Sequence, residues 1–129
     1  MRLLIDTHIL IWWISDLDRL SQRLKDAMED DEADIFVSVI TPWEISINSG
    51  LGKLTFDPAF LADFDIRIRG LAFTPLAVTS AHGVRAGQLK GRNRDPFDRM
   101  LAAQALTEGL TFATADPHFV EFGVPLIWT

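Results

Sequence analysis

The chain has no cysteine among its 129 residues, and it has no tyrosine. Without cysteine there are no disulfide bonds, no thiolate metal sites and no cysteine nucleophile. The same absence fits a reducing compartment, so we expect a cytoplasmic protein. No apolar run approaches the roughly 20 residues of a membrane span. The N-terminus meets an acid already at Asp6, too early for a secretory signal peptide. We therefore expect no membrane partner.

An excess of positive charge is also missing, because the formal net charge is −6. This balance argues against a generic nucleic-acid coat protein, which is usually basic. It does not exclude an enzyme that acts on nucleic acid, since a bound metal ion neutralises the carboxylates that hold it. With 48% apolar residues, a chain of this length can bury a core. We expect a single domain that spans residues 1–129.

Short apolar or β-prone segments alternate with helical ones along the chain. We expect strands at residues 3–5, 35–39, within 71–78, at 110–113 and at 125–128. Helices are expected at residues 7–14, 21–30, 41–50, 57–67, 80–89 and 95–109, with a short helical turn after Asp116. Strands that alternate with helices predict an α/β fold on a mainly parallel sheet with right-handed crossovers.

Four carboxylates each stand close to the start of a helix, and three of them directly follow a predicted strand. They are Asp6, Glu44, Asp98 and Asp116. The carboxyl ends of parallel strands open on one edge of the sheet, where ligands of open α/β sheets bind. Acids gathered there repel one another, and their pKa values rise unless a cation holds them together. The pattern therefore predicts a site for a hard metal ion with oxygen ligands.

Helix capping is the alternative explanation for these acids. Thr41 and Glu44 have the spacing of a capping box. Asp95 is placed to cap a helix that has Asp98 in its first turn, and Asp116 precedes a proline as a cap residue often does. However, serine, threonine and asparagine cap helices equally well, so capping does not require an acid at all four positions.

Four segments carry a resemblance to a known family. They are Asp6-Thr7-His8, Ser38-x-x-Thr41-x-x-Glu44, the run from Asp98 to Ala105, and the run from Thr114 to Phe119. Each resembles a motif of the PIN-domain ribonucleases, and their order and spacing are similar to those of VapC-type toxins of bacterial toxin–antitoxin pairs. The resemblance implies a three-layer α/β/α sandwich. It also implies a Mg²⁺- or Mn²⁺-dependent endoribonuclease that forms a homodimer and is held inactive by a cognate antitoxin.

Carried over by position, the resemblance makes the four carboxylates the catalytic, metal-binding acids, with Asp6 as the central ligand. Asp95 lies three residues before Asp98, so either acid can be the direct ligand. We favour Asp98, because Asp95 is better placed to cap the helix or to hold a metal-bound water. Thr114 is expected to hydrogen-bond an acid or such a water. The family often has asparagine where this chain has His8, which affects a supporting contact rather than a ligand.

Positive charge is concentrated beside Asp98, against the acidic average. The candidates for contact with RNA phosphates are Arg85, Lys90, Arg92, Arg94 and Arg99. The alternative is a solvated loop in which Arg94 and Arg99 pair with Asp95 or neighbouring acids.

The aromatic residues suggest both a core and a partner surface. We expect Trp43 to pack in the core. Trp12 and Trp13 point in different directions on one helix, so we expect one of them to face a second subunit or an antitoxin. Phe56, Phe60 and Phe64 recur every four residues and form either part of the core or an antitoxin groove.

Two other functions are compatible with the same acids. A Mg²⁺ phosphohydrolase of small phosphate esters would use similar carboxylates, although Asp6-Thr7-His8 lacks a second aspartate two residues after the first. A non-catalytic partner-binding module would use the acids only as caps. Metal binding separates this last class from the enzymes, and cleavage of internal RNA bonds separates the two enzymes.

Overall fold

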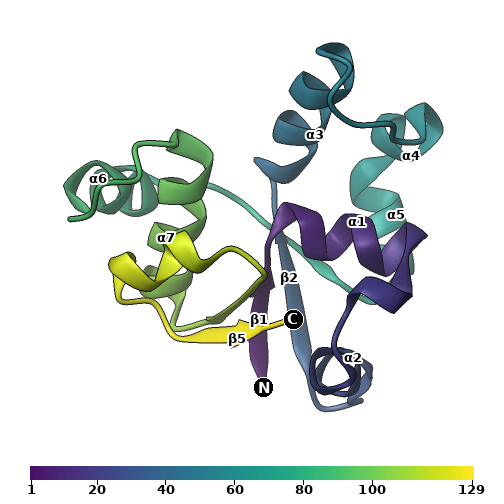
Figure 1. Ribbon diagram of the computed structural model, residues 1–129, viewed down its shortest axis with the longest axis horizontal. Helices are drawn as coiled ribbons and strands as arrows, with labels where there is room; N and C mark the ends of the chain where they lie inside the picture. Colours follow the sequence, from purple (N-terminus) through teal and green to yellow (C-terminus); the bar gives the residue numbers. More distant parts are fainter.

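The computed structural model describes all 129 residues and has a five-stranded sheet at its centre (Figure 1). The strands are β1 (Arg2–Ile5), β2 (Asp34–Ser38), β3 (Thr74–Leu76), β4 (Thr111–Thr114) and β5 (Leu126–Trp128). They are all parallel and lie in the order β3-β2-β1-β4-β5. The predicted parallel α/β sheet is confirmed, including the short third strand and the edge strand at the end of the chain.

Helices cover both faces of this sheet. They are α1 (Thr7–Ser15), α2 (Gln22–Glu29), α3 (Thr41–Gly50), α4 (Pro58–Ala62), α5 (Phe64–Gly70), α6 (Ser80–Gln88) and α7 (Pro96–Glu108), with 3₁₀ turns η1 (Leu17–Arg19) and η2 (Pro117–Phe122). In Figure 1, α1, α2, α4 and α5 lie on one side of the strands and α6 and α7 on the other. This arrangement is the predicted three-layer α/β/α sandwich. None of the helices is long and apolar enough to cross a bilayer.

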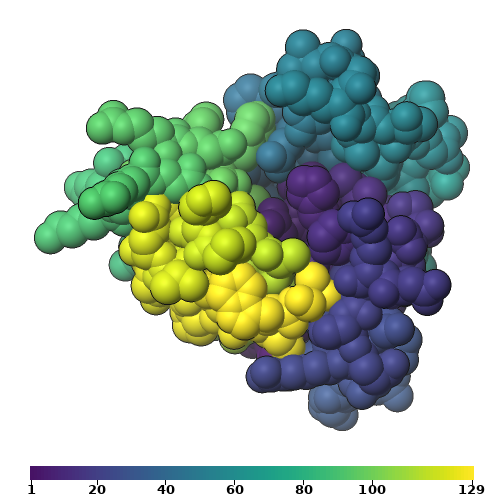
Figure 2. All heavy atoms as spheres, in the orientation of Figure 1, coloured from purple at the N-terminus to yellow at the C-terminus, as the bar shows by residue number.

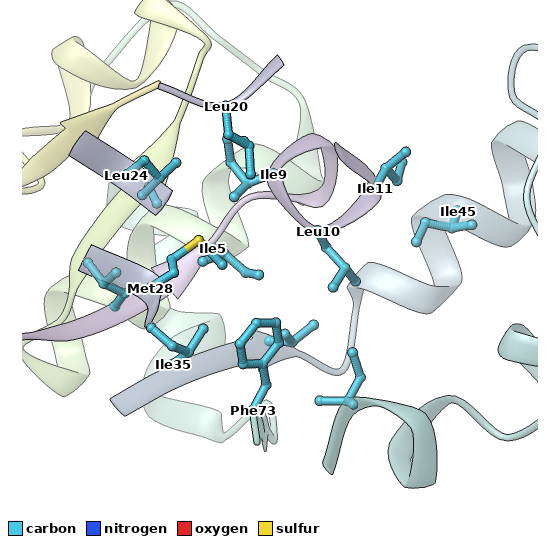
Figure 3. Packing of buried hydrophobic residues seen from close by; sticks show 14 of the residues in the cluster. Ile5, Ile9, Leu10, Ile11, Leu20, Leu24, Met28, Ile35, Ile45 and Phe73 are labelled. Atoms are coloured by element: carbon cyan, nitrogen blue, oxygen red, sulfur yellow. The ribbon is translucent and has the colours of Figure 1, made fainter. Parts of the chain in front are cut away.

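The alternation of side chains along β1 builds a separate core on each face. Leu3 and Ile5 face α1 and α2 within a cluster of 17 buried residues, part of which Figure 3 shows. Leu4 points the other way, into a cluster of nine that includes Leu101 of α7 and Phe112 of β4. The side chains of Leu3, Leu4 and Ile5 are fully buried, and only Arg2 at the start of β1 is exposed. A strand buried on both faces reads as a continuous apolar run, as this one does.

The local signals that start and stop helices act as expected at several positions. Ser21 accepts a hydrogen bond from the backbone N–H of Leu24, and Asp57 accepts one from that of Ala59. Gly109 terminates α7 with φ 67°, a left-handed conformation that glycine adopts without a side-chain penalty. Each of these residues was readable from the sequence because the interaction is local.

The helix expected over residues 57–67 is wrong in one respect, because the chain breaks it at Asp63. This residue has φ −116° and ψ 35°, outside the helical region, so α4 and α5 are separate short helices. The rings of Phe56, Phe60 and Phe64 meet edge to face, with successive centroids 5.4 and 5.6 Å apart. Phe60 and Phe64 are buried, so this stripe belongs to the core.

The tryptophans do not follow the simplest expectation. Trp43 is 61% exposed, so the prediction that it packs in the core is wrong. Trp12 and Trp13 are both half-buried in this one chain. The ring of Trp13 lies 6.0 Å from that of Phe73. That of Trp12 lies 5.7 Å from the ring of His8. Whether either tryptophan meets a partner stays a prediction.

Candidate active site

The four predicted acids lie at the edge of the sheet where the parallel strands have their carboxyl ends. Asp6 follows β1, Glu44 lies in the first turn of α3 after β2, Asp98 lies in the first turn of α7, and Asp116 follows β4. In Figure 1 the N-terminal end of α1 lies beside the base of α3 at this edge. In Figure 2, α1 reaches the surface between the teal α3–α5 region and the green and yellow C-terminal half.

Asp6 is the buried acid of the group, with 8% of its surface exposed. One carboxylate oxygen accepts a hydrogen bond from the backbone N–H of Thr7 at 2.8 Å, and the other accepts one from the hydroxyl of Thr114 at 2.7 Å. Burial raises the pKa of Asp6 to about 7, and the charges of Asp98 and Glu44 add to the rise. The two hydrogen bonds oppose it. The expected contact of Thr114 with an acid is thus present.

Glu44 does not take part in a capping box. Its Oε1 accepts a hydrogen bond from the hydroxyl of Thr7 at 2.5 Å, from the helix that follows Asp6. The cap position of α3 is Ile40, and no side chain caps it. The hydroxyl of Thr41 is buried and has no partner. The capping explanation of Glu44 is therefore wrong: a contact between α1 and α3 sets the position of this carboxylate.

Asp95 has the capping role that the sequence suggested, whereas the role of Asp98 as the direct ligand stays a prediction. Asp95 caps α7, with its Oδ1 accepting hydrogen bonds from the backbone N–H groups of Phe97 and Asp98. The Asp98 carboxylate is left free of the helix, and its Oδ2 accepts a hydrogen bond from the side-chain amide of Asn93 at 2.7 Å. The pKa of Asp98 is raised to about 6, mainly by partial burial and also by the charges of Asp95, Asp116 and Glu44, while the hydrogen bond from Asn93 opposes the rise.

Asp116 both caps a turn and borders the site. Its Oδ1 accepts a hydrogen bond from the backbone N–H of His118, so the capping interpretation holds for this residue. Its own N–H donates to the hydroxyl of Thr114, which also holds Asp6. A single threonine therefore fixes both the buried acid and the loop that carries Asp116.

Two cavities lie at this edge and share His8. One of about 240 Å³ is lined by Thr7, His8, Ile11, Glu44, Asn48, Lys53 and Leu54. The other, of about 280 Å³, is lined by Asp6, His8, Trp12, Ala115 and Asp116. His8 is exposed and belongs to both linings. His8 therefore stands between the cavity of Glu44 and that of Asp6.

The four acids have the ligand chemistry of a hard divalent cation, but no three acidic or histidine side chains stand close enough together in this structure to hold one ion. The acids offer carboxylate oxygens, which Mg²⁺ and Mn²⁺ prefer. Asp98 and Glu44 raise the pKa of Asp6, and Asp116 and Glu44 raise that of Asp98, so the four carboxylates form one electrostatic cluster. A cation would relieve this repulsion.

The basic residues near the site fall into two groups. Arg85 on α6, and Lys90, Arg92 and Arg94 in the loop before α7, are exposed and form no ion pair. Arg99 is different, because its three guanidinium nitrogens donate to the carbonyls of Leu89, Gly91 and Asn93. The alternative in which Arg94 or Arg99 pairs with Asp95 is not what the structure shows. Arg99 holds the loop, and its donors are not directed at a phosphate.

The same loop, residues 89–95, is held from the other side by Glu121. The Glu121 carboxylate accepts a hydrogen bond from the backbone N–H of Asn93 at 2.6 Å, and this contact lowers the pKa of Glu121. Gly91 has φ 140°, and a Cβ there would lie 2.9 Å from Glu121 Oε1. A side chain at this position would therefore be strained by the backbone conformation and would displace the Glu121 carboxylate. The loop is held in one conformation, which fixes Asn93 against Asp98.

Comparison with known proteins agrees with this geometry. The sequence profile of the PIN domain matches residues 3–125. The chain belongs to the PIN-domain family. A search of the curated proteins gives no match to this PIN domain.

Solved structures with the same fold include several bacterial complexes. VapBC2 from Rickettsia felis, bound to a DNA fragment from its promoter, has a chain with TM-score 0.72, 19% identity and coverage of 99% of this chain and 98% of its own. A chain of DNA-bound VapBC from Salmonella typhimurium has a TM-score of 0.71 and 18% identity, and the match covers 99% of this chain and 98% of the other. A chain of FitAcB from Neisseria gonorrhoeae has a TM-score of 0.59 and 21% identity, and the match covers 97% of this chain and 96% of the other. At these identities the likeness establishes the fold of this PIN domain.

Two residues of the site escaped the sequence analysis. Thr7, which holds Glu44, was visible only as part of a motif, and nothing local indicates that its hydroxyl reaches a residue 37 positions away. Asn93 makes hydrogen bonds to Asp95, Asp98, Arg99 and Glu121. One sequence signal could have drawn attention to Asn93: it is an uncharged polar residue between Arg92 and Arg94 in a basic turn.

Proposed function

We propose that this PIN domain is a Mg²⁺- or Mn²⁺-dependent endoribonuclease, the VapC-type toxin of a toxin–antitoxin pair. The observation that carries the proposal is the buried carboxylate of Asp6, whose pKa is raised by burial and by Asp98 and Glu44. The mutual repulsion of Asp6, Glu44 and Asp98 is unfavourable for the folded protein, so these acids have no evident structural benefit. A bound cation would make the same arrangement favourable. Membership of the PIN family and the order of the motifs support the same reading.

The chain's own residues supply binding and orientation. Thr114 and the Thr7 backbone hold Asp6, the Thr7 hydroxyl holds Glu44, and Asn93 holds Asp98. Asp116 would complete the set of direct or water-mediated ligands. A divalent ion bound there supplies a water of lowered pKa and a Lewis acid for the phosphoryl oxygens. No side-chain nucleophile is then needed, in agreement with the absence of cysteine and tyrosine.

The substrate and partners follow from the same proposal. RNA phosphates would contact the exposed cations of Arg85, Lys90, Arg92 and Arg94. A cognate antitoxin and a second copy of the chain would be the protein partners, in the cytoplasm, with residues 1–129 acting as one domain. The solved VapBC and FitAB relatives are complexes, which supports a protein partner here.

The test is cleavage of a panel of structured RNAs by the parent protein and by Asp6→Asn, with Mn²⁺ or Mg²⁺ and with EDTA. We expect internal cleavage by the parent, lost in EDTA and reduced at least about 100-fold in Asp6→Asn, because the central ligand is gone. Expression of Asp6→Asn in the host should also be non-toxic. An Asp6→Asn protein as active and toxic as the parent would refute the mechanism.

Two further outcomes assign the protein to the other classes. Hydrolysis of small phosphate esters without internal cleavage of RNA would favour a phosphohydrolase. No cleavage and no divalent cation bound, measured by titration calorimetry, would favour a non-catalytic partner-binding module. Asp26→Asn is a matched control, because Asp26 is exposed on α2 and contacts only Gln22 of the same helix.

A further inference from the structure

An apolar cavity lies between α3 and α7, beside the acids. It has a volume of about 290 Å³ and is lined by Ile40, Trp43, Ile47, Pro96, Phe97 and Met100. The rings of Trp43 and Phe97 meet edge to face, with centroids 4.9 Å apart and planes at 68°. Trp43 is 61% exposed and Ile47 is 39% exposed. This chain therefore presents an aromatic corner to solvent that its own core does not cover.

The cavity and the acids occupy the same two helices. Trp43 directly precedes Glu44 in α3, and Phe97 directly precedes Asp98 in α7. Consecutive residues on a helix point about 100° apart, so each aromatic ring lies next to a carboxylate and not over it. Both pairs stand in the first turns of their helices, at the carboxyl edge of the sheet. A ligand held at the acids would therefore have the aromatic corner beside it.

We propose that this cavity binds one unpaired nucleobase of the RNA, next to the phosphodiester bond held at the acids. The inference rests on the proposed function and deepens it. A nucleobase is flat and uncharged, and it stacks on tryptophan or phenylalanine. The nucleotide's phosphate needs positive charge nearby, and the basic loop with Arg92 and Arg94 leads directly into Pro96 of the cavity wall.

A second copy of this chain fits the cavity less well than a base. A two-fold contact centred on Trp43 and Phe97 would place Glu44, Asp95 and Asp98 of one copy near the same acids of the other. Like charges opposed across an interface are unfavourable, and the chain already carries a net charge of −6.

The proposal predicts a preference for single-stranded RNA at the cleavage site. Bases in a duplex are stacked and paired, so they cannot enter a lateral cavity, whereas unpaired bases in loops can be turned outward. The base beside the cleaved bond should then affect binding more than the others do.

The experiment measures binding without cleavage, using Asp6→Asn protein and a labelled single-stranded oligoribonucleotide, with no divalent cation added. A set of oligoribonucleotides, each with one abasic position, is compared on this protein and on the same protein with Trp43→Ala. We expect Trp43→Ala to weaken binding about tenfold, and one abasic position to weaken it equally. In Trp43→Ala that abasic position should cost nothing more, because the two changes remove the same contact. Trp43→Phe should retain most of the affinity.

Ile66→Ala is the matched control, because Ile66 is 73% exposed on α5 and is not part of the cavity lining. It should bind like the parent. Equal affinity of Trp43→Ala and the control would overturn the proposal, as would additive losses at every abasic position. Conversion of a dimer to a monomer by Trp43→Ala, seen by light scattering, would overturn it as well and assign the cavity to a second copy.

This assay is separable from the test of the enzyme. If the parent cleaves RNA but Trp43 and the abasic positions are uncoupled, the nuclease stands and the base site fails. If the parent cleaves nothing but the coupling is present, the base site stands as an RNA-binding feature and the proposed catalysis fails.

Discussion

Asn93 donates its side-chain amide to Asp98 across 2.7 Å and joins the basic loop to the acid cluster. The side-chain oxygen of Asn93 accepts a hydrogen bond from the backbone N–H of Asp95, and its backbone carbonyl accepts one from Arg99 Nε. Its backbone N–H donates to Glu121. One residue thus couples the position of a carboxylate to the shape of the segment that carries Arg92 and Arg94.

The first prediction concerns this residue. Asn93→Ala should weaken Mn²⁺ binding about tenfold, because Asp98 loses the donor that orients it. Titration calorimetry at pH 7.5 measures the affinity. Asn48→Ala is the control, since Asn48 lines the neighbouring cavity but makes no side-chain hydrogen bond to an acid. Unchanged Mn²⁺ affinity in Asn93→Ala would show that the contact does not organise the site.

The second prediction concerns the contact between Thr7 and Glu44. Thr7→Val keeps the shape of the side chain but removes the hydroxyl, so Glu44 loses its partner on α1. We expect Mn²⁺ affinity and RNA cleavage each to fall about tenfold or more. Thermal unfolding of the metal-free protein should change by only a few degrees. Thr7→Ser retains the hydroxyl and should behave like the parent; similar losses in both variants would contradict the role of the hydrogen bond.

The third prediction is a dependence of stability on pH in the metal-free protein. The pKa of Asp6 is raised from 3.8 to about 7, so between these values the folded protein retains a proton that the unfolded chain has released. Stability from this group is complete below about pH 4 and is lost as the pH rises through 7. The slope for one proton is at most about 1.4 kcal/mol per pH unit.

Urea unfolding in EDTA at pH 5 and pH 7.5 tests this sign. The parent should lose about 2–3 kcal/mol more than Asp6→Asn over this interval, because the asparagine has no proton to release. Mn²⁺ should restore stability to the parent at pH 7.5 and do little for the variant. Parallel curves for the two proteins would show that Asp6 titrates normally in the fold.

The sequence predicts what depends on neighbours along the chain. The five strands, the caps at Ser21, Asp57 and Asp95, and the stop at Gly109 follow from interactions within a few residues. The place of Asp6, Glu44 and Asp116 at one edge also follows, because any parallel sheet brings its strand ends together. This argument does not place Asp98, because α7 follows α6 and a loop and not a strand.

What it does not predict depends on contacts between distant segments. Glu44 had the spacing of a capping box, but a hydroxyl from another helix binds it instead. Trp43 looked like a core residue because its size favours burial, yet α3 turns it toward solvent. Arg99 looked like one more cation of a basic patch, and its donors serve three carbonyls of the chain. In each case a local pattern allows two partners, and tertiary geometry selects one.

The last prediction separates Arg99 from Arg94 within that patch. Arg99→Lys keeps the charge but loses the planar fork that reaches three carbonyls, so we expect the free energy of unfolding to fall by about 2 kcal/mol. Arg94→Lys should change it by less than about 0.5 kcal/mol, because Arg94 is exposed and makes no side-chain contact. Urea unfolding of both variants measures the difference. RNA binding tests the charge of Arg94 separately. Arg94→Gln should leave the free energy of unfolding unchanged but reduce the salt dependence of RNA binding by about one counterion, because one phosphate contact is lost. If Arg94→Gln binds RNA with the parent's salt dependence, Arg94 does not contact phosphate.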